Sequence, residues 1–247
     1  MLFRSHSTQN GRFPETVSLV LWAFETMKTG GETIGQIFNY LGVRPIKQKS
    51  VWTTELEIIP LSEMRHPRIN VVITICGIFR DTFPYLMDLI NQAIELVAAQ
   101  DETLDQNYVK KSQLTLDPNK GDLSLARIFG PPPGKYNTNL TDIIGKGEWK
   151  EEKELAEDYI SNMGHAYLKN QIIKAAPTEF RQNIGQVEYI SQIRDGSEYQ
   201  ITDLDHYYEF SGGFIKAAEE ITAKRAPLYI ADTSSVEIRV KDRKSVV

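Results

Sequence analysis

Short apolar runs alternate along this chain with apolar residues at helical spacing. Residues 17–22 form an apolar run, interrupted only by Ser18, which is typical of a buried strand. The polar, glycine-bearing stretch 25–31 follows it and predicts a loop. Four apolar residues at i, i+3, i+4 and i+7 then predict a helix that ends before Gly42: Ile34, Ile37, Phe38 and Leu41.

Three further junctions between a strand and a polar loop resemble the first. Residues 71–76 predict a buried strand, residues 77–81 a loop, and Pro84 the first turn of an amphipathic helix. Weaker strands are predicted at 187–193 and 228–231, with a helix at 213–223 between them. Strands that alternate with helices predict an α/β fold, with a mostly parallel sheet and flanking helices.

The middle of the chain has a different composition. Residues 101–147 are rich in Asp, Asn, Gly and Pro, and the run 131–134 predicts a loop because proline restricts the backbone and lacks a donor. Residues 148–166 predict a charged, amphipathic helix. We therefore expect four kinds of region: an α/β half at 12–100, an inserted helix and loop subdomain over the sheet at 101–185, a returning α/β segment at 186–236, and non-native or disordered ends at 1–9 and 237–247.

Composition narrows the class of protein. The chain has 247 residues, of which 41% are hydrophobic and 25% charged, as in ordinary globular domains. A net charge of −5 argues against a general nucleic-acid surface. No apolar run approaches the roughly 18 residues of a membrane-spanning helix. The lone cysteine, Cys76, lies at the end of an apolar run and is expected to be a buried small side chain. A cytoplasmic setting fits these features.

Several ordered blocks resemble one known family. Among them are NVVITICGIFRDTFPYLMDLI, RIFGPPPGKYNTNL and IRDGSEYQITDLDHYYEFSGGF. With the opening segment, these blocks resemble the large subunits of cobaltochelatases and magnesium chelatases, over roughly residues 10–233. Members of that family are several times longer, so we expect an internal fragment. The family has glycines where this chain has Asn137 and Asn139, which puts a close glycine contact there in doubt.

The resemblance implies a function. It implies part of the tetrapyrrole-binding large subunit of an ATP-dependent chelatase, which inserts Co²⁺ or Mg²⁺ into a corrinoid or porphyrin ring. AAA+ partner subunits would bind the ATP, since no GxxxxGK[ST] occurs in this chain. A family motif of the HGTLEWLPG kind is missing, so the chain alone is expected to be inactive. The competing interpretation is a non-catalytic docking module for the AAA+ partners.

Metal insertion needs a transient metal site and a proton acceptor, for which imidazole and carboxylates are suited. The densest set lies between 194 and 213, with His206 as the candidate metal ligand and proton acceptor. The alternative interpretation of this segment is a solvated acidic loop, in which an aspartate caps a helix that begins near Gly213. No Cys and His residues of this sequence have the spacing of a structural zinc site, so no fixed zinc site is expected. The residues assigned to the catalytic and ring-facing roles here are Asp195, Asp203, Asp205, His206, Tyr207 and Tyr208.

Polar residues also follow the predicted strands. Ligands bind beyond the carboxyl ends of parallel strands, so these residues are candidates for contact with the ring. For the adjacent Arg and Asp pairs, mutual pairing within a loop is an equally good interpretation. Tyr136, in the proline-rich loop, offers an aromatic face to a flat ligand, unless that loop is only a rigid crossover. The substrate-binding candidates outside the acidic segment are Glu25, Thr26, Arg80, Asp81, Arg194 and Tyr136.

Overall fold

The computed structural model describes residues 11–46, 54–116, 118–147, 149–194, 205–232 and 239–242. Its strands are β1 (Thr16–Leu21), β2 (Val43–Ile46), β3 (Glu55–Ile58), β4 (Asn70–Ile75), β5 (Ile128–Gly130), β6 (His165–Tyr167), β7 (Ile173–Ala175), β8 (Tyr189–Arg194), β9 (Leu228–Asp232) and β10 (Arg239–Asp242). Its α-helices are α2 (Ala23–Lys28), α3 (Glu32–Leu41), α4 (Gly77–Thr82), α5 (Pro84–Ala98), α6 (Tyr108–Thr115), α7 (Leu140–Lys146), α8 (Glu152–Met163), α9 (Pro177–Ile184) and α10 (Asp205–Thr222). Short 3₁₀ turns lie at Leu61–Glu63, Pro118–Leu125 and Lys169–Gln171.

One eight-stranded sheet forms the centre, in the order β10-β9-β8-β1-β4-β5-β6-β7. The five strands from β9 to β5 run parallel to their neighbours. The strands beyond them, β10 on one side and β6 and β7 on the other, are antiparallel. This confirms the predicted α/β fold with a mostly parallel sheet. A separate antiparallel hairpin pairs β2 with β3.

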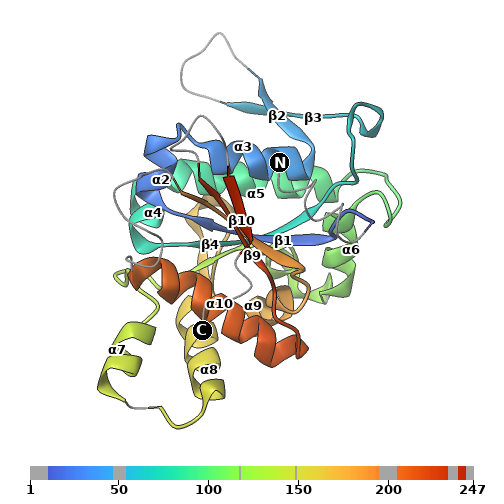
Figure 1. The fold of residues 1–247 in the computed structure, drawn as a ribbon. Helices are drawn as coiled ribbons and strands as arrows, with labels where there is room; N and C mark the ends of the chain where they lie inside the picture. The colour runs from blue at the N-terminus through green and yellow to red at the C-terminus, as the bar shows by residue number, and fades with distance from the viewer. Residues whose placement is uncertain are drawn as a thin grey trace.

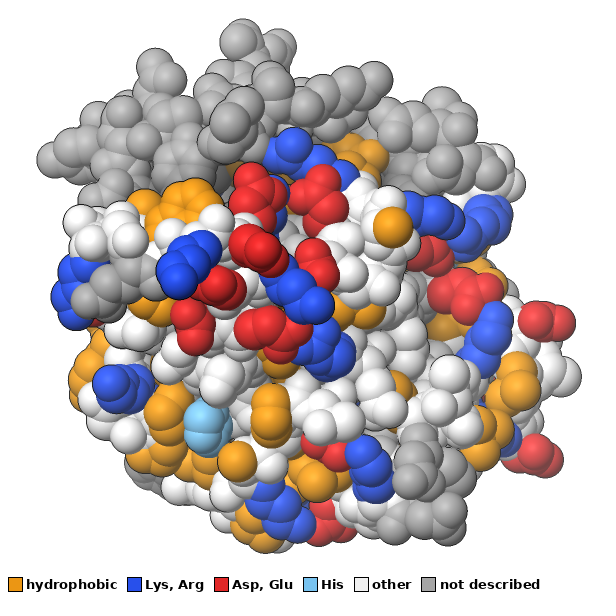
Figure 2. All heavy atoms as spheres, turned by 90° about the horizontal axis from the view of Figure 1, so that it is seen from below, with side chains coloured by type: hydrophobic (Ala, Val, Ile, Leu, Met, Phe, Trp, Pro, Cys, Tyr) orange, Lys and Arg blue, Asp and Glu red, His pale blue; other side chains and the backbone are white. Residues whose placement is uncertain are grey.

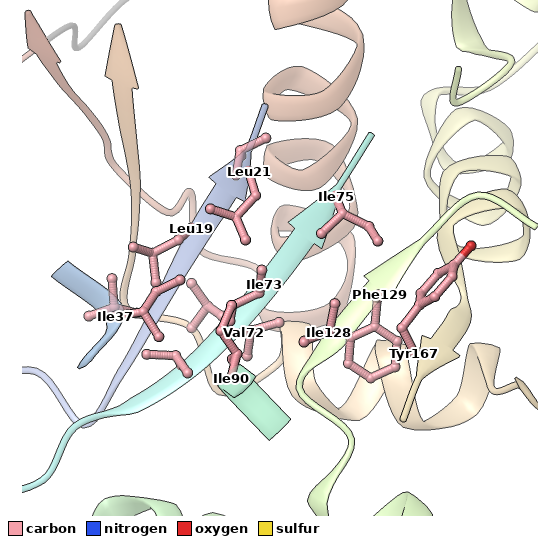
Figure 3. Packing of buried hydrophobic residues seen from close by; sticks show 14 of the residues in the cluster. Leu19, Leu21, Ile37, Val72, Ile73, Ile75, Ile90, Ile128, Phe129 and Tyr167 are labelled. Carbon is pink, nitrogen blue, oxygen red and sulfur yellow. The ribbon is translucent and has the colours of Figure 1, made fainter. Parts of the chain in front are cut away.

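Helices cover both faces of the sheet (Figure 1). On one face, the apolar side chains of β1, β4 and β5 pack near Ile37 of α3 and Ile90 of α5 (Figure 3). On the other face, the rings of Phe129, Phe180 and Phe214 connect β5, α9 and α10, with centroids 4.8 and 6.3 Å apart. Burial on both faces explains why the central strands are almost continuously apolar.

Three short segments differ from the expectation. The predicted loops at 25–31 and 77–81 are largely helical, as α2 and α4, and α10 begins at Asp205 rather than near Gly213. Helices of six residues are too short to show an apolar period, and their stability comes from packing. Gly212 and Gly213 suggested a helix start, but α10 continues through both of them.

The segment 101–185 contributes to the sheet as well as covering it. It supplies β5, which pairs with β4, and the antiparallel strands β6 and β7. The sequence predicted an insertion or subdomain over the sheet, but strands of three residues leave no alternating pattern that would have indicated their place within the sheet. Residues 239–242 form β10, although the end at 237–247 was expected to be disordered or non-native.

Arg127 is completely buried at the amino ends of the strands. Its guanidinium donates to Asn70 Oδ1 (2.8 Å), Ser112 Oγ (3.1 Å) and the carbonyl oxygens of Ser124 and Ala126. Burial lowers the pKa of Arg127 to about 9. These contacts join β4, α6 and the start of β5, so Arg127 has a structural role at the edge opposite the candidate site.

Gly213 allows α10 to approach α8 closely. A Cβ at this position would lie 2.7 Å from Leu140 Cδ1 and would also overlap the ring of Tyr159. Both neighbours are buried, so they cannot move aside easily.

We expect Gly213→Ala to lower the free energy of unfolding by about 1–3 kcal/mol through overpacking. The matched control is Gly212→Ala in the same helix, since a Cβ there meets nothing within 4 Å. That variant should gain about 0.5–1 kcal/mol from helix propensity. Urea denaturation of both variants measures the difference, and equal stabilities would contradict the packing argument.

Candidate active-site edge

The carboxyl ends of the parallel strands lie along one edge of the sheet. Glu25 lies four residues beyond β1, Arg80 five residues beyond β4, and Arg194 is the last residue of β8. Because β8, β1 and β4 are adjacent and parallel, these positions share that edge, as predicted. The rings of Trp22 and Phe210 meet edge to face at 4.8 Å and bring α10 against the end of β1.

Arg80 is held by its own helix and by the loop after β5. Its Nε and Nη2 donate to the two carboxylate oxygens of Asp81, at 2.6 and 3.0 Å. Its Nη1 donates to the carbonyl oxygens of Pro132 (2.9 Å) and Lys135 (3.1 Å), and more weakly to Pro131 (3.5 Å). The hydrogen bonds from Arg80 lower the pKa of the Asp81 carboxyl. This geometry supports mutual pairing of the two residues, the alternative to contact with a ligand.

Tyr136 lies on the outside of this arrangement. Its ring centroid is 5.4 Å from Arg80 Cζ, and its side chain is 54% exposed. A Cβ at Gly77 would lie 2.7 Å from Tyr136 Cδ1 and 2.5 Å from the Lys135 carbonyl oxygen. Gly77 therefore allows the loop to lie directly on the first turn of α4.

Glu209 belongs to the acidic cluster predicted between 194 and 213, but no catalytic or ring-binding role was assigned to it from the sequence. It lies on α10, is only 4% exposed, and accepts hydrogen bonds from Thr138 N (2.7 Å) and Thr138 Oγ1 (2.5 Å). Thr138 belongs to the same proline-rich loop, so α10 fixes the far end of that loop. The DHYYEF block contains Glu209, but no local pattern indicates its partner.

Glu25 and Thr26 are buried in the first turn of α2, with Glu25 8% exposed. Beside them, Phe24 and Met27 of α2 and Ile78 of α4 are exposed. The edge thus combines buried polar groups with exposed apolar side chains. Such a combination suits a ligand with a flat apolar body and polar substituents.

Much of the acidic segment lies outside the residues that the structure describes. Asp195 and Asp203 lie outside the described residues. Asp205, His206, Tyr207 and Tyr208 belong to the first turn of α10, but their side chains lie outside the described part. The proposed metal and proton-transfer roles of these residues therefore stay predictions.

Within the described residues, no group of three His, Cys, Asp or Glu side chains is placed to hold a metal ion. In the same part of the chain, no helix is both long enough and apolar enough to cross a bilayer. Cys76 is buried, as predicted, and its Sγ accepts a hydrogen bond from Phe79 N at 3.4 Å.

A different surface is strongly charged. Viewed from below, acidic side chains gather with lysines and arginines over the helices of the lower layer (Figure 2). Lys216 pairs with Glu152 and Glu219, and Arg181 pairs with Glu157. These ion pairs are exposed and are typical of a solvated helix surface.

Comparison with known proteins identifies the family. The sequence model of the CobN/Magnesium Chelatase family matches residues 1–247. The chain belongs to the CobN/magnesium chelatase family. It is 30% identical to the magnesium-chelatase subunit ChlH of Oryza sativa subsp. japonica over 100% of this chain and 18% of that protein. It is 30% identical to the aerobic cobaltochelatase subunit CobN of Sinorhizobium sp over 96% of this chain and 19% of the relative.

A solved structure shows the same fold. The catalytic subunit of cobaltochelatase from Mycobacterium tuberculosis superimposes with a TM-score of 0.92 and 29% sequence identity, over 98% of this chain and 21% of that subunit. The chain thus spans about a fifth of the length of the relatives it matches. Members of this family of large subunits are involved in the insertion of metals into tetrapyrroles.

Proposed function

We propose that this chain forms one wall of the tetrapyrrole cleft in the large subunit of an ATP-dependent metal chelatase. The observation that carries the proposal is the edge where the parallel strands end, which carries Glu25 and the loop held by Arg80 and Glu209, beside exposed apolar side chains. The ring would lie with its flat body on the apolar side chains and its polar rim toward the strand ends. Membership of the chelatase family supports this placement.

The substrate metal in this proposal is Co²⁺ or Mg²⁺. His206, with Asp203 or Asp205 beside it in the sequence, would accept a pyrrole proton or hold the metal transiently. Tyr207 and Tyr208 would belong to the same wall: one would pack under the segment 203–209, and the other would face the ring. ATP would be bound by AAA+ partner subunits in the cytoplasm.

The alternative function is a docking module for those partner subunits. It is favoured by apolar side chains far from the strand ends, because Ile144 of α7 and Trp149 beyond it are exposed. Figure 1 shows α7 and the segment toward α8 projecting from the rest of the fold. An exposed apolar projection is a common feature of docking surfaces.

Two measurements with the full-length subunit separate these functions: a titration of tetrapyrrole fluorescence and an assay of partner-driven turnover. Glu25→Gln keeps the size of the side chain but removes its charge, and it should weaken tetrapyrrole binding about tenfold or more. Ile144→Ser should leave tetrapyrrole affinity unchanged. If Glu25→Gln binds normally while Ile144→Ser abolishes partner-driven turnover, the docking function is supported and the cleft wall is not.

The isolated chain is expected to neither hydrolyse ATP nor insert metal. The sequence contains no phosphate-binding P-loop, and it lacks the HGTLEWLPG-like motif of the family. A coupled assay with the chain, a tetrapyrrole, Co²⁺ or Mg²⁺, and ATP measures both activities. Metal insertion by the pure chain would contradict the assignment of one cleft wall.

A further inference from the structure

The proline-rich loop at 131–139 is fixed at both of its ends by residues from different helices. It begins directly after β5, at the carboxyl edge of the sheet, and runs between α4 and α10. Arg80 of α4 holds its first half and Glu209 of α10 holds Thr138 near its end. Tyr136 lies between these two attachments.

The attachment at Arg80 involves all three nitrogens of the guanidinium group. Arginine has five N–H donors on three nitrogens, and here Nε and Nη2 bind Asp81 while Nη1 binds carbonyl oxygens of the loop. Tyr167 adds a further attachment, because its hydroxyl donates to the Pro131 carbonyl oxygen. A guanidinium with these acceptors, on a side chain that is only 7% exposed, favours the pairing role over direct contact with a substrate.

The attachment at Glu209 is equally specific. Both its carboxylate and Thr138 are buried, and one carboxylate oxygen accepts from both the backbone N–H and the hydroxyl of Thr138. Hydrogen bonds to a buried charged group are stronger than neutral ones, and losing them leaves a polar group unsatisfied. The end of the loop therefore has one strongly preferred position on α10.

Between the attachments, the loop presents Tyr136. Gly134 and Asn139 adopt positive φ angles of 81° and 68°, which turn the chain on either side of it. The ring rests on Gly77 and beside Arg80, yet about half of it faces outward. A side chain held in this way loses little conformational entropy when a ligand binds against it.

We propose that Arg80 and Glu209 are positioning residues, which fix the 131–139 loop so that the ring of Tyr136 contacts the tetrapyrrole. This inference rests on the proposed cleft wall. It adds Tyr136 as the residue that contacts the ligand, and Arg80 and Glu209 as the residues that position Tyr136. Arg80 and Glu209 act through the loop and make no contact with the substrate themselves.

The experiment uses the full-length subunit with the variants Arg80→Lys, Glu209→Gln and Tyr136→Ala. Hydrogen exchange of the backbone amides of residues 134–139 measures how firmly the loop is held, since the three prolines before them have no N–H, and tetrapyrrole titration measures affinity. Arg80→Lys and Glu209→Gln should each speed exchange in the loop and weaken tetrapyrrole binding about tenfold, the loss expected for one such buried contact. The factor by which the KM for the tetrapyrrole rises should be larger than the factor by which kcat falls. Matched controls are Arg181→Lys and Glu157→Gln, an exposed pair that should change neither quantity.

Tyr136→Ala separates positioning from a purely structural role. It should weaken binding to the same extent but leave exchange in the rest of the loop nearly unchanged. The double variant Arg80→Lys with Tyr136→Ala should then bind no more weakly than Tyr136→Ala alone, because both changes remove the same contact. If the two effects multiply, or if the loop loosens without loss of affinity, the inference is wrong.

Two further outcomes distinguish this inference from the function on which it rests. If Glu25→Gln weakens tetrapyrrole binding but Tyr136→Ala does not, the cleft wall stands and the positioning inference fails. If neither variant changes the affinity, both fail. Should Glu209→Gln not fold, Thr138→Val replaces it. That variant removes the hydroxyl, which donates to Glu209 and accepts from Leu140 N at 3.4 Å, and keeps the backbone N–H that donates to Glu209.

Discussion

Replacement of Arg68 by alanine is expected to lower the free energy of unfolding by about 3–5 kcal/mol, the range for breaking a buried ion pair. Arg68 is 1% exposed, and its Nε lies 2.9 and 2.7 Å from the two carboxylate oxygens of Glu102. Its other nitrogens donate to the carbonyl oxygens of Leu41, Gly42 and Ile59. The substitution leaves a largely buried carboxylate and three carbonyl groups without this partner. Urea denaturation of the protein measures the loss.

The matched control is Arg44→Ala. Arg44 also pairs with a glutamate, Glu57, at 2.7 Å, but the two side chains are 51% and 46% exposed. An exposed pair contributes little to stability, because water solvates both charges when the pair is broken, so the loss in Arg44→Ala should be much smaller than in Arg68→Ala. Equal losses in Arg68→Ala and Arg44→Ala would show that burial does not determine the effect, contrary to this account.

His206→Ala is expected to reduce metal insertion by the full-length subunit about 100-fold or more, the usual effect of removing a general acid–base group. His206 falls in the first turn of α10, the helix that meets the end of β1 through Phe210. An imidazole with an unperturbed pKa of about 6.5 can exchange protons near neutral pH. Folding and partner-driven ATP hydrolysis should persist.

The control for this prediction is His66→Ala. His66 lies in the turn before Pro67, and its Nδ1 is 2.7 Å from the Pro67 carbonyl oxygen, outside the proposed cleft wall. It should leave insertion near the wild-type rate. If His206→Ala also inserts metal at that rate, or simply unfolds the subunit, the catalytic role of residues 203–209 should be abandoned.

The central strands were predictable because burial on both faces of the sheet requires a run of mostly apolar residues, which is visible in the sequence. The runs at 17–22, 71–76 and 228–231 correspond to β1, β4 and β9 with shifts of one residue at their ends. The three-residue strands β5 to β7 and the six-residue helices α2 and α4 carry no such signal. Tertiary packing determines them, as it also determines the passage of α10 through Gly212 and Gly213.

The shared edge of the candidate residues was predictable, but their contacts were not. Parallel topology alone places Glu25, Arg80 and Arg194 at one edge. The partners of Arg80 and Glu209 lie 52 and 71 residues away along the chain, at Pro132 and Thr138. No local spacing indicates pairings of that range. From the sequence, substrate contact and pairing with a neighbour were therefore equally good interpretations for Arg80, and Glu209 was one member of the acidic cluster with no role of its own.

The most direct test of the proposed cleft wall is the position of the tetrapyrrole in a structure of the full-length subunit bound to it. The account predicts that the ring lies at the carboxyl ends of β1, β4 and β8, against Tyr136 and within reach of Glu25. A ring bound entirely by other parts of the subunit, with this edge turned away from it, would contradict the account.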